Sequence, residues 1–431
     1  RKQVALRQEQ QELRQRIEEL EKESQQTPFF SMKGEFEKQI YTAHHRIGEI
    51  DSMFTATAFQ RMLLIVFFMA VIAIIGSLFK HWRGMYVGIF LLAWFWVGIW
   101  IIKTTPNPFI DVFVFQQESA DALLHGRNPY SMTFTNIYGE GSFVYAKELQ
   151  VDGHVNFGFP YAPLSLLMII PGYLAGDHRY AQLVALVIAA GLVAFARPGI
   201  IATLAAILLL TTSRVFMVLE LGWTEPLVIL WLAATVFCAC RYPRATPYML
   251  GLLLASKQYT ILIPPLAALL VTPYFAWRGY GKLLLKAFLV IAVVSLPLIL
   301  WDPHAFMRSA VTLQLKQPLR EDALSYLLWW YWHVDKEAAK AMTWLPFAGV
   351  AVMIPLCIWL WPRNAGGFAG AVAMVYFTFF ALNRQAFCNY YFLVIAAMCC
   401  AIAALDHEPR PDPLTSRAEP EVPELVAMAL Q

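Results

Sequence analysis

The 431-residue chain is poor in charge, since only 15% of its residues are Asp, Glu, Lys or Arg, against about 25% in soluble domains. Hydrophobic residues make up 58% instead, above the roughly 45–50% of soluble proteins, and they gather in long runs. This pattern excludes an ordinary water-soluble domain and predicts an all-α polytopic membrane protein. The formal net charge of +3 is too small to indicate a nucleic-acid partner, so we expect none.

Cysteine is scarce as well, and all six cysteines lie in or beside apolar runs. Cys238 and Cys240, like the adjacent Cys399 and Cys400, lack the spacing and the histidine partners of a metal site. We therefore interpret the cysteines as small apolar membrane residues. No cleavable signal peptide is expected, because the first apolar run begins only after residue 60.

The charged segment 1–60 carries two helical patterns. Leu6, Leu13 and Leu20 recur every seven residues, and apolar residues in 36–54 alternate in steps of four and three. The stretch "QQTPFFSMKGE" between them contains the Pro and Gly that end and restart helices. A helical hairpin is the prediction, although half of an intermolecular coiled coil that forms homo- or hetero-oligomers fits equally well.

A membrane domain is predicted over 61–405, with about eleven or twelve crossings and contacts to membrane lipids. One run is interrupted by "SKQY" and by two prolines, so it predicts a broken helix, which is tolerated at membrane depth only when buried or lining a cavity. The tail 406–431 is rich in Pro and Glu and is predicted to be disordered. The apolar runs are 61–79, 85–103, 160–177, 180–196, 198–212, 224–240, 247–273, 283–301, 343–361, 366–382 and 387–405.

Lys and Arg in short loops set the expected orientation. "KHWRG", "RYPR", "WRGYGK" and "WPR" are placed in the cytoplasm, so the long hydrophilic segments 104–159 and 302–342 face the other side, together with the N-terminal hairpin. This orientation is inconsistent at one place, because four crossings between residues 160 and 240 would leave the following loop on the wrong side of the membrane. One run, either 180–196 or 198–212, must be tilted, re-entrant or fused with its neighbour.

Polar residues converge on this non-cytoplasmic face. Asp111 follows the second run and begins "DVFVFQQESADALLHG", which predicts an amphipathic helix lying on the membrane interface. Ionisable groups at membrane depth are costly and usually serve function or pair with one another. The other polar candidates beside apolar runs or in the outer loops are Glu220, Glu225, Lys257, Gln258, Arg308, Arg320, Asp322, Arg384, Asn389 and Tyr390.

Several motifs follow one another along the chain. They are Asp111, "ALLHGRNPYS" with Tyr130, "PYAPL" with Tyr161, "GWTE", Lys257 and Asn389-Tyr390. Their order resembles the GT-C class of polytopic glycosyltransferases and is most similar to glycosyltransferase family 87, which includes bacterial polyprenyl-phosphate-dependent mannosyltransferases. The resemblance covers about 85–405 and departs from the family pattern at "YAPL" and at "GWTE", where "GQxN" is commoner.

The resemblance implies a GT-C-like helical bundle that transfers a sugar, mannose by default, from a polyprenyl-phosphate donor to a glycan or glycolipid acceptor. Asp111 would be the general base of an inverting reaction on the extracytoplasmic face of a bacterial inner membrane. The leaving phosphate needs a cation, for which Lys257, Arg308, Arg320 and Arg384 are candidates. A divalent metal on Asp111 with Glu220 or Glu225 stays open.

Two other classes of protein are alternative hypotheses for this sequence. A lipid or solute transporter or flippase also uses broken helices and buried charges, and a membrane scaffold with a degenerate site would need only the coiled coil. The long loop after the second span favours the enzyme.

Overall fold

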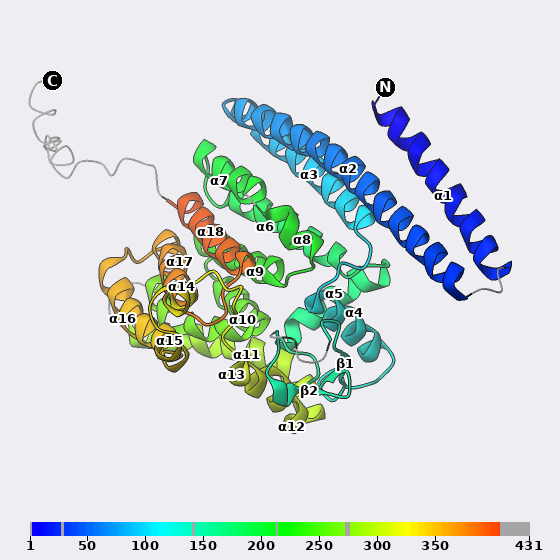
Figure 1. Cartoon of the computed structure of the whole chain (residues 1–431). Helices are drawn as coiled ribbons and strands as arrows, with labels where there is room; N and C mark the ends of the chain where they lie inside the picture. Colours follow the sequence, from blue (N-terminus) through cyan, green and yellow to red (C-terminus); the bar gives the residue numbers. More distant parts are fainter. Residues whose placement is uncertain are drawn as a thin grey trace, which may run out of the picture.

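The computed structural model describes residues 2–26, 30–139, 142, 144–212, 214–271 and 276–405 (Figure 1). This part of the chain is mainly helical with almost no strand, which confirms the all-α class. Its strands are three antiparallel two-residue pieces in the order β1-β3-β2, and their bounds are β1 Phe134–Thr135, β2 Gln150–Val151 and β3 His154–Val155. The predicted disordered tail lies outside the described residues.

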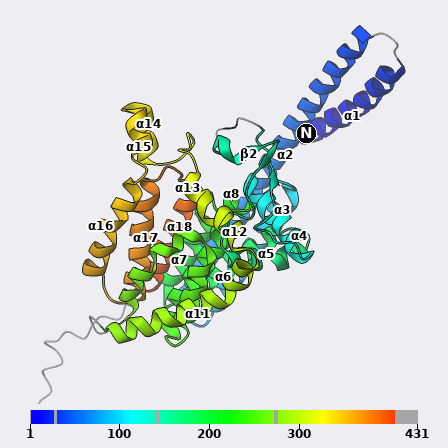
Figure 2. The same ribbon diagram turned by 90° about the horizontal axis from the view of Figure 1, so that it is seen from below.

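The first two helices, α1 (Lys2–Gln26) and α2 (Phe30–Ser77), pack along each other (Figures 1 and 2). Leu20 is 1% exposed between them, and the Arg46 guanidinium lies 2.9 Å from the Glu9 carboxylate. The pairing of α1 with α2 therefore occurs within one chain. Helix α2 continues through residue 60 without a break, so the expected boundary between soluble and membrane parts falls inside a helix.

Three helices in the described residues are long and apolar enough to cross a membrane: Ala58–Ser77 of α2, α3 (Arg83–Thr104) and α11 (Trp277–Trp301). The sequence predicts more full crossings because hydropathy does not register where a helix stops. A spanning helix needs about 20 residues, and several apolar runs yield shorter ones. These are α7 Ile200–Thr211, α10 Thr246–Ser256, α16 Leu345–Leu360, α17 Ala365–Ala381 and α18 Cys388–Ala403.

Two irregular places in the bundle match expected breaks. Helices α5 (Pro163–Leu174) and α6 (Arg179–Phe195) are bent by 110° relative to each other, and together they are long and apolar enough for one broken span. This agrees with the alternative in which 180–196, and not 198–212, is the irregular run. Helix α10 ends at Ser256, and the chain continues as the 3-10 helices η2 (Gln258–Leu262) and η3 (Pro264–Leu270). The interruption at "SKQY" is therefore confirmed.

Arg179 holds the bend between α5 and α6 in place. Its guanidinium lies 2.6 Å from Asp177 and donates to the backbone oxygens of Glu220 (2.7 Å) and Ile102 (3.2 Å). These oxygens belong to the end of α8 (Val215–Glu220) and to α3. Arg179 is fully buried, so the paired charge ties three helices together at one end of the bundle.

The two long hydrophilic segments meet. The Gly158 amide donates to Ser309 Oγ at 2.8 Å, and Ser131 Oγ lies 3.3 Å from the Asp302 carboxylate. Figure 2 shows β2, α14 and the α1–α2 hairpin toward the same side of the bundle. The short elements of these segments are η1 Lys147–Leu149, α12 Pro303–Phe306, the π-helical turn η4 Met307–Thr312, α13 Leu313–Lys316, α14 Tyr326–His333 and α15 Lys336–Ala341.

Candidate active site

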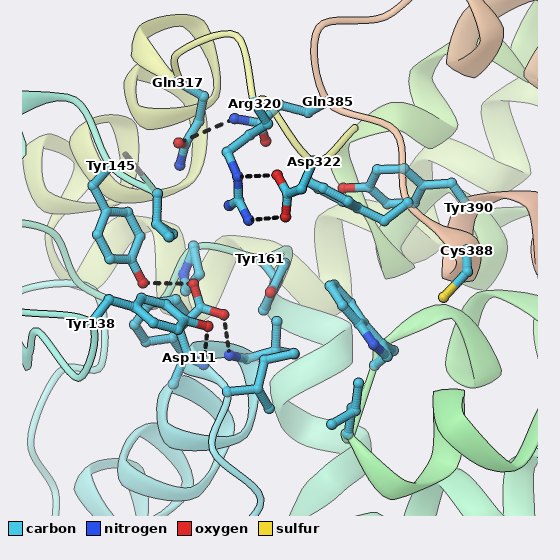
Figure 3. A pocket seen from close by; sticks show the side chains of 18 of the residues that line it. Asp111, Tyr138, Tyr145, Tyr161, Gln317, Arg320, Asp322, Gln385, Cys388 and Tyr390 are labelled. Atoms are coloured by element: carbon cyan, nitrogen blue, oxygen red, sulfur yellow. Dashed lines mark hydrogen bonds and ion pairs between the residues drawn. The ribbon is translucent and has the colours of Figure 1, made fainter. Parts of the chain in front are cut away.

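A cavity of about 720 Å³ lies where the two long segments meet the bundle (Figure 3). Its walls come from the start of α4 (Asp111–Leu124), the loop around residues 138–145, the segment after α13 and the loop between α17 and α18. The sequence placed these segments on one face, and the structure joins them around a single space. The predicted site residues that line it are Asp111, Tyr161, Arg320, Asp322 and Tyr390.

Asp111 is the first residue of α4, and its carboxylate is held at both oxygens. Tyr145 donates its hydroxyl to Oδ2 at 2.6 Å, and the Val112 amide donates to Oδ1 at 2.8 Å. The Asp111 amide donates to the Tyr138 hydroxyl oxygen at 3.2 Å. A carboxylate in the first turn also gains from the helix dipole, so the side chain is fixed in direction toward the cavity (Figure 3).

Burial raises the pKa of Asp111, while the hydrogen bonds from Tyr145 and Val112 and the charge of Arg320 oppose the rise. Burial, with the nearby Asp111 charge, raises the pKa of Tyr138 to about 12 and that of Tyr145 further. Both phenols therefore stay protonated near neutral pH. A carboxyl with a raised pKa can accept a proton more readily than a free Asp, as a general base requires.

Arg320 faces Asp111 across the cavity (Figure 3). Its guanidinium makes two hydrogen bonds of 2.8 Å to Asp322 and lies 5.0 Å above the Phe387 ring. Its amide donates to the Arg384 oxygen at 3.1 Å, which attaches this segment to the loop between α17 and α18. The Arg320 charge is thus partly balanced by a carboxylate that shares the cavity.

The other predicted cations are placed differently. Arg384 donates to the backbone oxygens of Gln314 (3.0 Å) and Leu315 (2.8 Å), which gives it a structural role. Arg308 is exposed on η4 and does not line the cavity. Neither residue is therefore positioned as a phosphate ligand in this cavity.

Lys257 and Glu225 form a buried ion pair beside the cavity. Lys257 Nζ contacts a Glu225 carboxylate oxygen and lies 2.7 Å from Thr224 Oγ1. Asn389 donates to the other Glu225 oxygen at 2.7 Å, and the Tyr259 hydroxyl adds a bond of 3.2 Å. The break after α10 places Lys257 beside Glu225 at the start of α9 (Glu225–Arg241). Lys257 thereby neutralises Glu225, since a buried charge must be balanced.

Aromatic rings connect this ion pair to the cavity wall. Lys257 Nζ lies 5.3 Å from the ring centres of both Tyr161 and Tyr390 and 5.2 Å from that of Tyr259. These distances allow cation–π attraction. The pair therefore supports two of the rings that line the cavity rather than facing a ligand itself.

Two further predicted residues also support the wall. The Tyr130 hydroxyl donates to the Tyr161 oxygen at 3.0 Å, and Gln258 Nε2 donates to the Pro160 oxygen at 2.7 Å. Glu220 lies elsewhere, at an apolar groove beside α2. It does not line the Asp111 cavity.

The metal site that the sequence left open, on Asp111 with Glu220 or Glu225, is not formed by these pairs of acids. Both oxygens of Glu225 accept from other side chains, and Glu220 lines a different groove. Within the described residues no three His, Cys, Asp or Glu side chains group as metal ligands. The arrangement around Asp111 is suited to proton transfer through hydrogen bonds.

Cavity residues that the sequence did not single out include Tyr138, Tyr145, Gln317 and Arg214. The two tyrosines stand out in the polar loop "NIYGEGSFVYAK" as aromatic residues without an apolar run, which is the one signal that could have found them. Arg214 interrupts "TTSRVFM" between two apolar runs.

No family model, curated protein or solved structure matches this chain.

Proposed function

We propose that the protein is an integral-membrane glycosyltransferase of the GT-C type. It transfers a sugar, mannose by default, from a polyprenyl-phosphate donor to a glycan or glycolipid acceptor. Asp111 removes the proton of the acceptor hydroxyl as that oxygen attacks the anomeric carbon; the bond from this carbon to the phosphate oxygen breaks, and the configuration inverts. The reaction takes place at the extracytoplasmic face of a bacterial inner membrane.

The observation that carries the proposal is the setting of Asp111. A carboxylate with a raised pKa is held at both oxygens, faces a cavity of about 720 Å³ and lies across from Arg320. A phosphate leaving group requires positive charge near the reacting carbon, and this cavity provides acid and cation together. Gln317 and Gln385 add amide groups suited to sugar hydroxyls.

The apolar character of the chain supports a lipid-linked donor. Three helices can cross a membrane, and the cavity forms where the polar segments 104–159 and 302–342 meet that bundle. The basic short loops favour an orientation with these segments outside the cytoplasm. An active site at the junction of the polar segments and the apolar bundle can be reached by a donor whose lipid tail stays in the bilayer.

The proposal is tested by transfer from radiolabelled polyprenyl-phosphate mannose and related donors in membranes containing the protein. Asp111→Asn should reduce transfer at least about a hundredfold, the lower range for a lost general base. Asp121→Asn is the matched control, because Asp121 lies on the same helix and pairs with Arg127 outside the cavity. Normal transfer by Asp111→Asn would remove this base. Absence of transfer by the wild type from every such donor would favour the transporter or scaffold hypotheses.

A further inference from the structure

A second cavity, an apolar groove of about 1100 Å³, runs along the membrane part of α2. Its walls come from α2, α3, α7 and α8. On α2 the lining extends from Phe59 to Ile74, which is roughly 22 Å at about 1.5 Å rise per residue. That length covers most of the hydrocarbon core of a bilayer, which is about 30 Å thick.

Arg214 and Met217 line both this groove and the Asp111 cavity, so the two spaces adjoin. Arg214 precedes α8 and has a φ of 76°, in the left-handed region that side chains other than glycine seldom adopt. Such conformations persist where the surroundings hold them, and they concentrate at functional sites. The chain thus places a cation where an apolar groove meets a polar cavity.

The charge of Arg214 is available, in contrast to the cations around it. Its guanidinium contacts the Met217 sulfur at 3.6 Å, and no carboxylate within the described residues pairs with it. Lys257 is neutralised by Glu225, and Arg320 is held by Asp322. The side chain of Arg214 is exposed, so it can turn toward an anion without breaking an ion pair.

We infer that the groove holds the hydrocarbon tail of the lipid-phosphate donor and that Arg214 binds its phosphate. The inference rests on the proposed function and identifies where its donor lies. A lipid with an apolar tail, an anionic group and a polar head matches the order of the surfaces: apolar groove, Arg214, Asp111 cavity. Glu220 also lines the groove and lies next to the charge of Arg179, which reduces its repulsion of an anion.

A competing groove also adjoins the Asp111 cavity. It has a volume of about 710 Å³, shares Leu324 with that cavity and is lined by α14 together with residues of α17 and α18. Trp329 and Trp332 give it aromatic walls, but its lining contains no Lys or Arg. It fits an apolar chain, but the cation of the cavity that it adjoins, Arg320, is already paired with Asp322, which favours the groove with Arg214.

Photolabelling with a polyprenyl phosphate that carries a diazirine on its tail tests the placement in nanodiscs. The labelled peptides should come from α2, α3, α7 or α8. A phosphatidylglycerol with a diazirine on one acyl chain is run in parallel and should label these helices about tenfold less at equal mole fraction. Labelling concentrated on α14, or equal labelling by both probes, would overturn the inference.

Matched variants test the two parts of the site. Val71→Trp fills the groove, whereas Ile72→Trp places the same ring on the adjacent exposed position of α2 outside the groove. Arg214→Gln removes the cation, and Arg308→Gln removes an exposed arginine outside both cavities. Arg214→Gln should lower labelling by about tenfold or more, the effect of one lost charge-assisted hydrogen bond. Val71→Trp should lower labelling by about tenfold because its ring takes the space of the tail.

The controls Ile72→Trp and Arg308→Gln should label as the wild type does. Unchanged labelling in Arg214→Gln would refute the phosphate contact, and unchanged labelling in Val71→Trp would refute the tail site. Labelling that obeys these rules in a protein with no transferase activity would leave the lipid-phosphate site standing and remove the proposed function.

Discussion

Removal of one phenol should move the titration of Asp111 in a known direction. In Tyr145→Phe the hydroxyl that donates to Asp111 Oδ2 at 2.6 Å is lost. That bond favours the ionised carboxylate, while burial favours the neutral acid. The variant keeps the ring that packs near Phe157, so the pKa of Asp111 should rise further with little change in the wall of the cavity.

The size of the shift follows from the strength of the bond. A hydrogen bond to a charged group contributes about 1.5–3 kcal/mol, and 1.36 kcal/mol corresponds to about one pKa unit. The expected rise is therefore about one to two units. Because Asp111 is partly exposed to the cavity, water can replace some of the lost bond, and a value near one unit is expected.

The pKa is measured from the infrared carboxyl band of the protonated acid, which is assigned by its loss in Asp111→Asn. Tyr173→Phe is the control, since that hydroxyl donates to Asp121 at 2.9 Å outside the cavity. Arg320→Gln should raise the pKa less, because its charge is a smaller influence than the Tyr145 bond. An unchanged or lower midpoint in Tyr145→Phe would refute this account of Asp111.

The raised pKa of Asp111 in Tyr145→Phe should also change the pH dependence of sugar transfer. If ionised Asp111 is the base, transfer falls as the pH drops through its pKa. A higher pKa in Tyr145→Phe then moves the acid limb of the pH–rate profile to higher pH by the same amount.

Two predictions concern stability and use reversible unfolding in mixed detergent. Lys257→Met leaves Glu225 buried without its cation and should lower the free energy of unfolding by about 3–5 kcal/mol. The double variant with Glu225→Gln should lose less, and equal losses would show that the pair is not coupled. In Gly158→Ala the added Cβ would lie 2.3 Å from the Tyr130 oxygen, so a loss of about 1–3 kcal/mol is expected. Gly84→Ala, where nothing lies within 4 Å, should change little, and similar effects of the two would contradict the crowding at Gly158.

Local features of the fold are readable in the sequence. Half-apolar periodicity predicts the helix that begins at Asp111, and the paired prolines after Lys257 predict the broken segment, because both depend on neighbouring residues alone. The number of full crossings is not readable in this way. Residues 163–195 are apolar enough for a span, yet they fold as two helices bent by 110°, and hydropathy is insensitive to such a bend.

The contents of the site depend on contacts between distant segments. Glu225 and Asn389 are both visible as polar residues beside apolar runs, but their hydrogen bond joins positions 164 residues apart. Arg320 and Arg384 look alike in the sequence, yet one faces the cavity and the other binds backbone oxygens. What separates them is the tertiary position of their neighbours, which no single segment encodes.

Helix α2 also has a mechanical consequence. Its 48 residues form one rod of about 72 Å, with the hairpin at one end and the wall of the apolar groove toward the other. Its most extensive described contacts are with α1, α3 and α7, and the Phe59 ring also packs against Phe216 of α8. A partner that binds the hairpin and rotates it would therefore move α2 as one rigid helix. The groove wall would move with the hairpin, so binding on the aqueous side would change the width of the apolar groove.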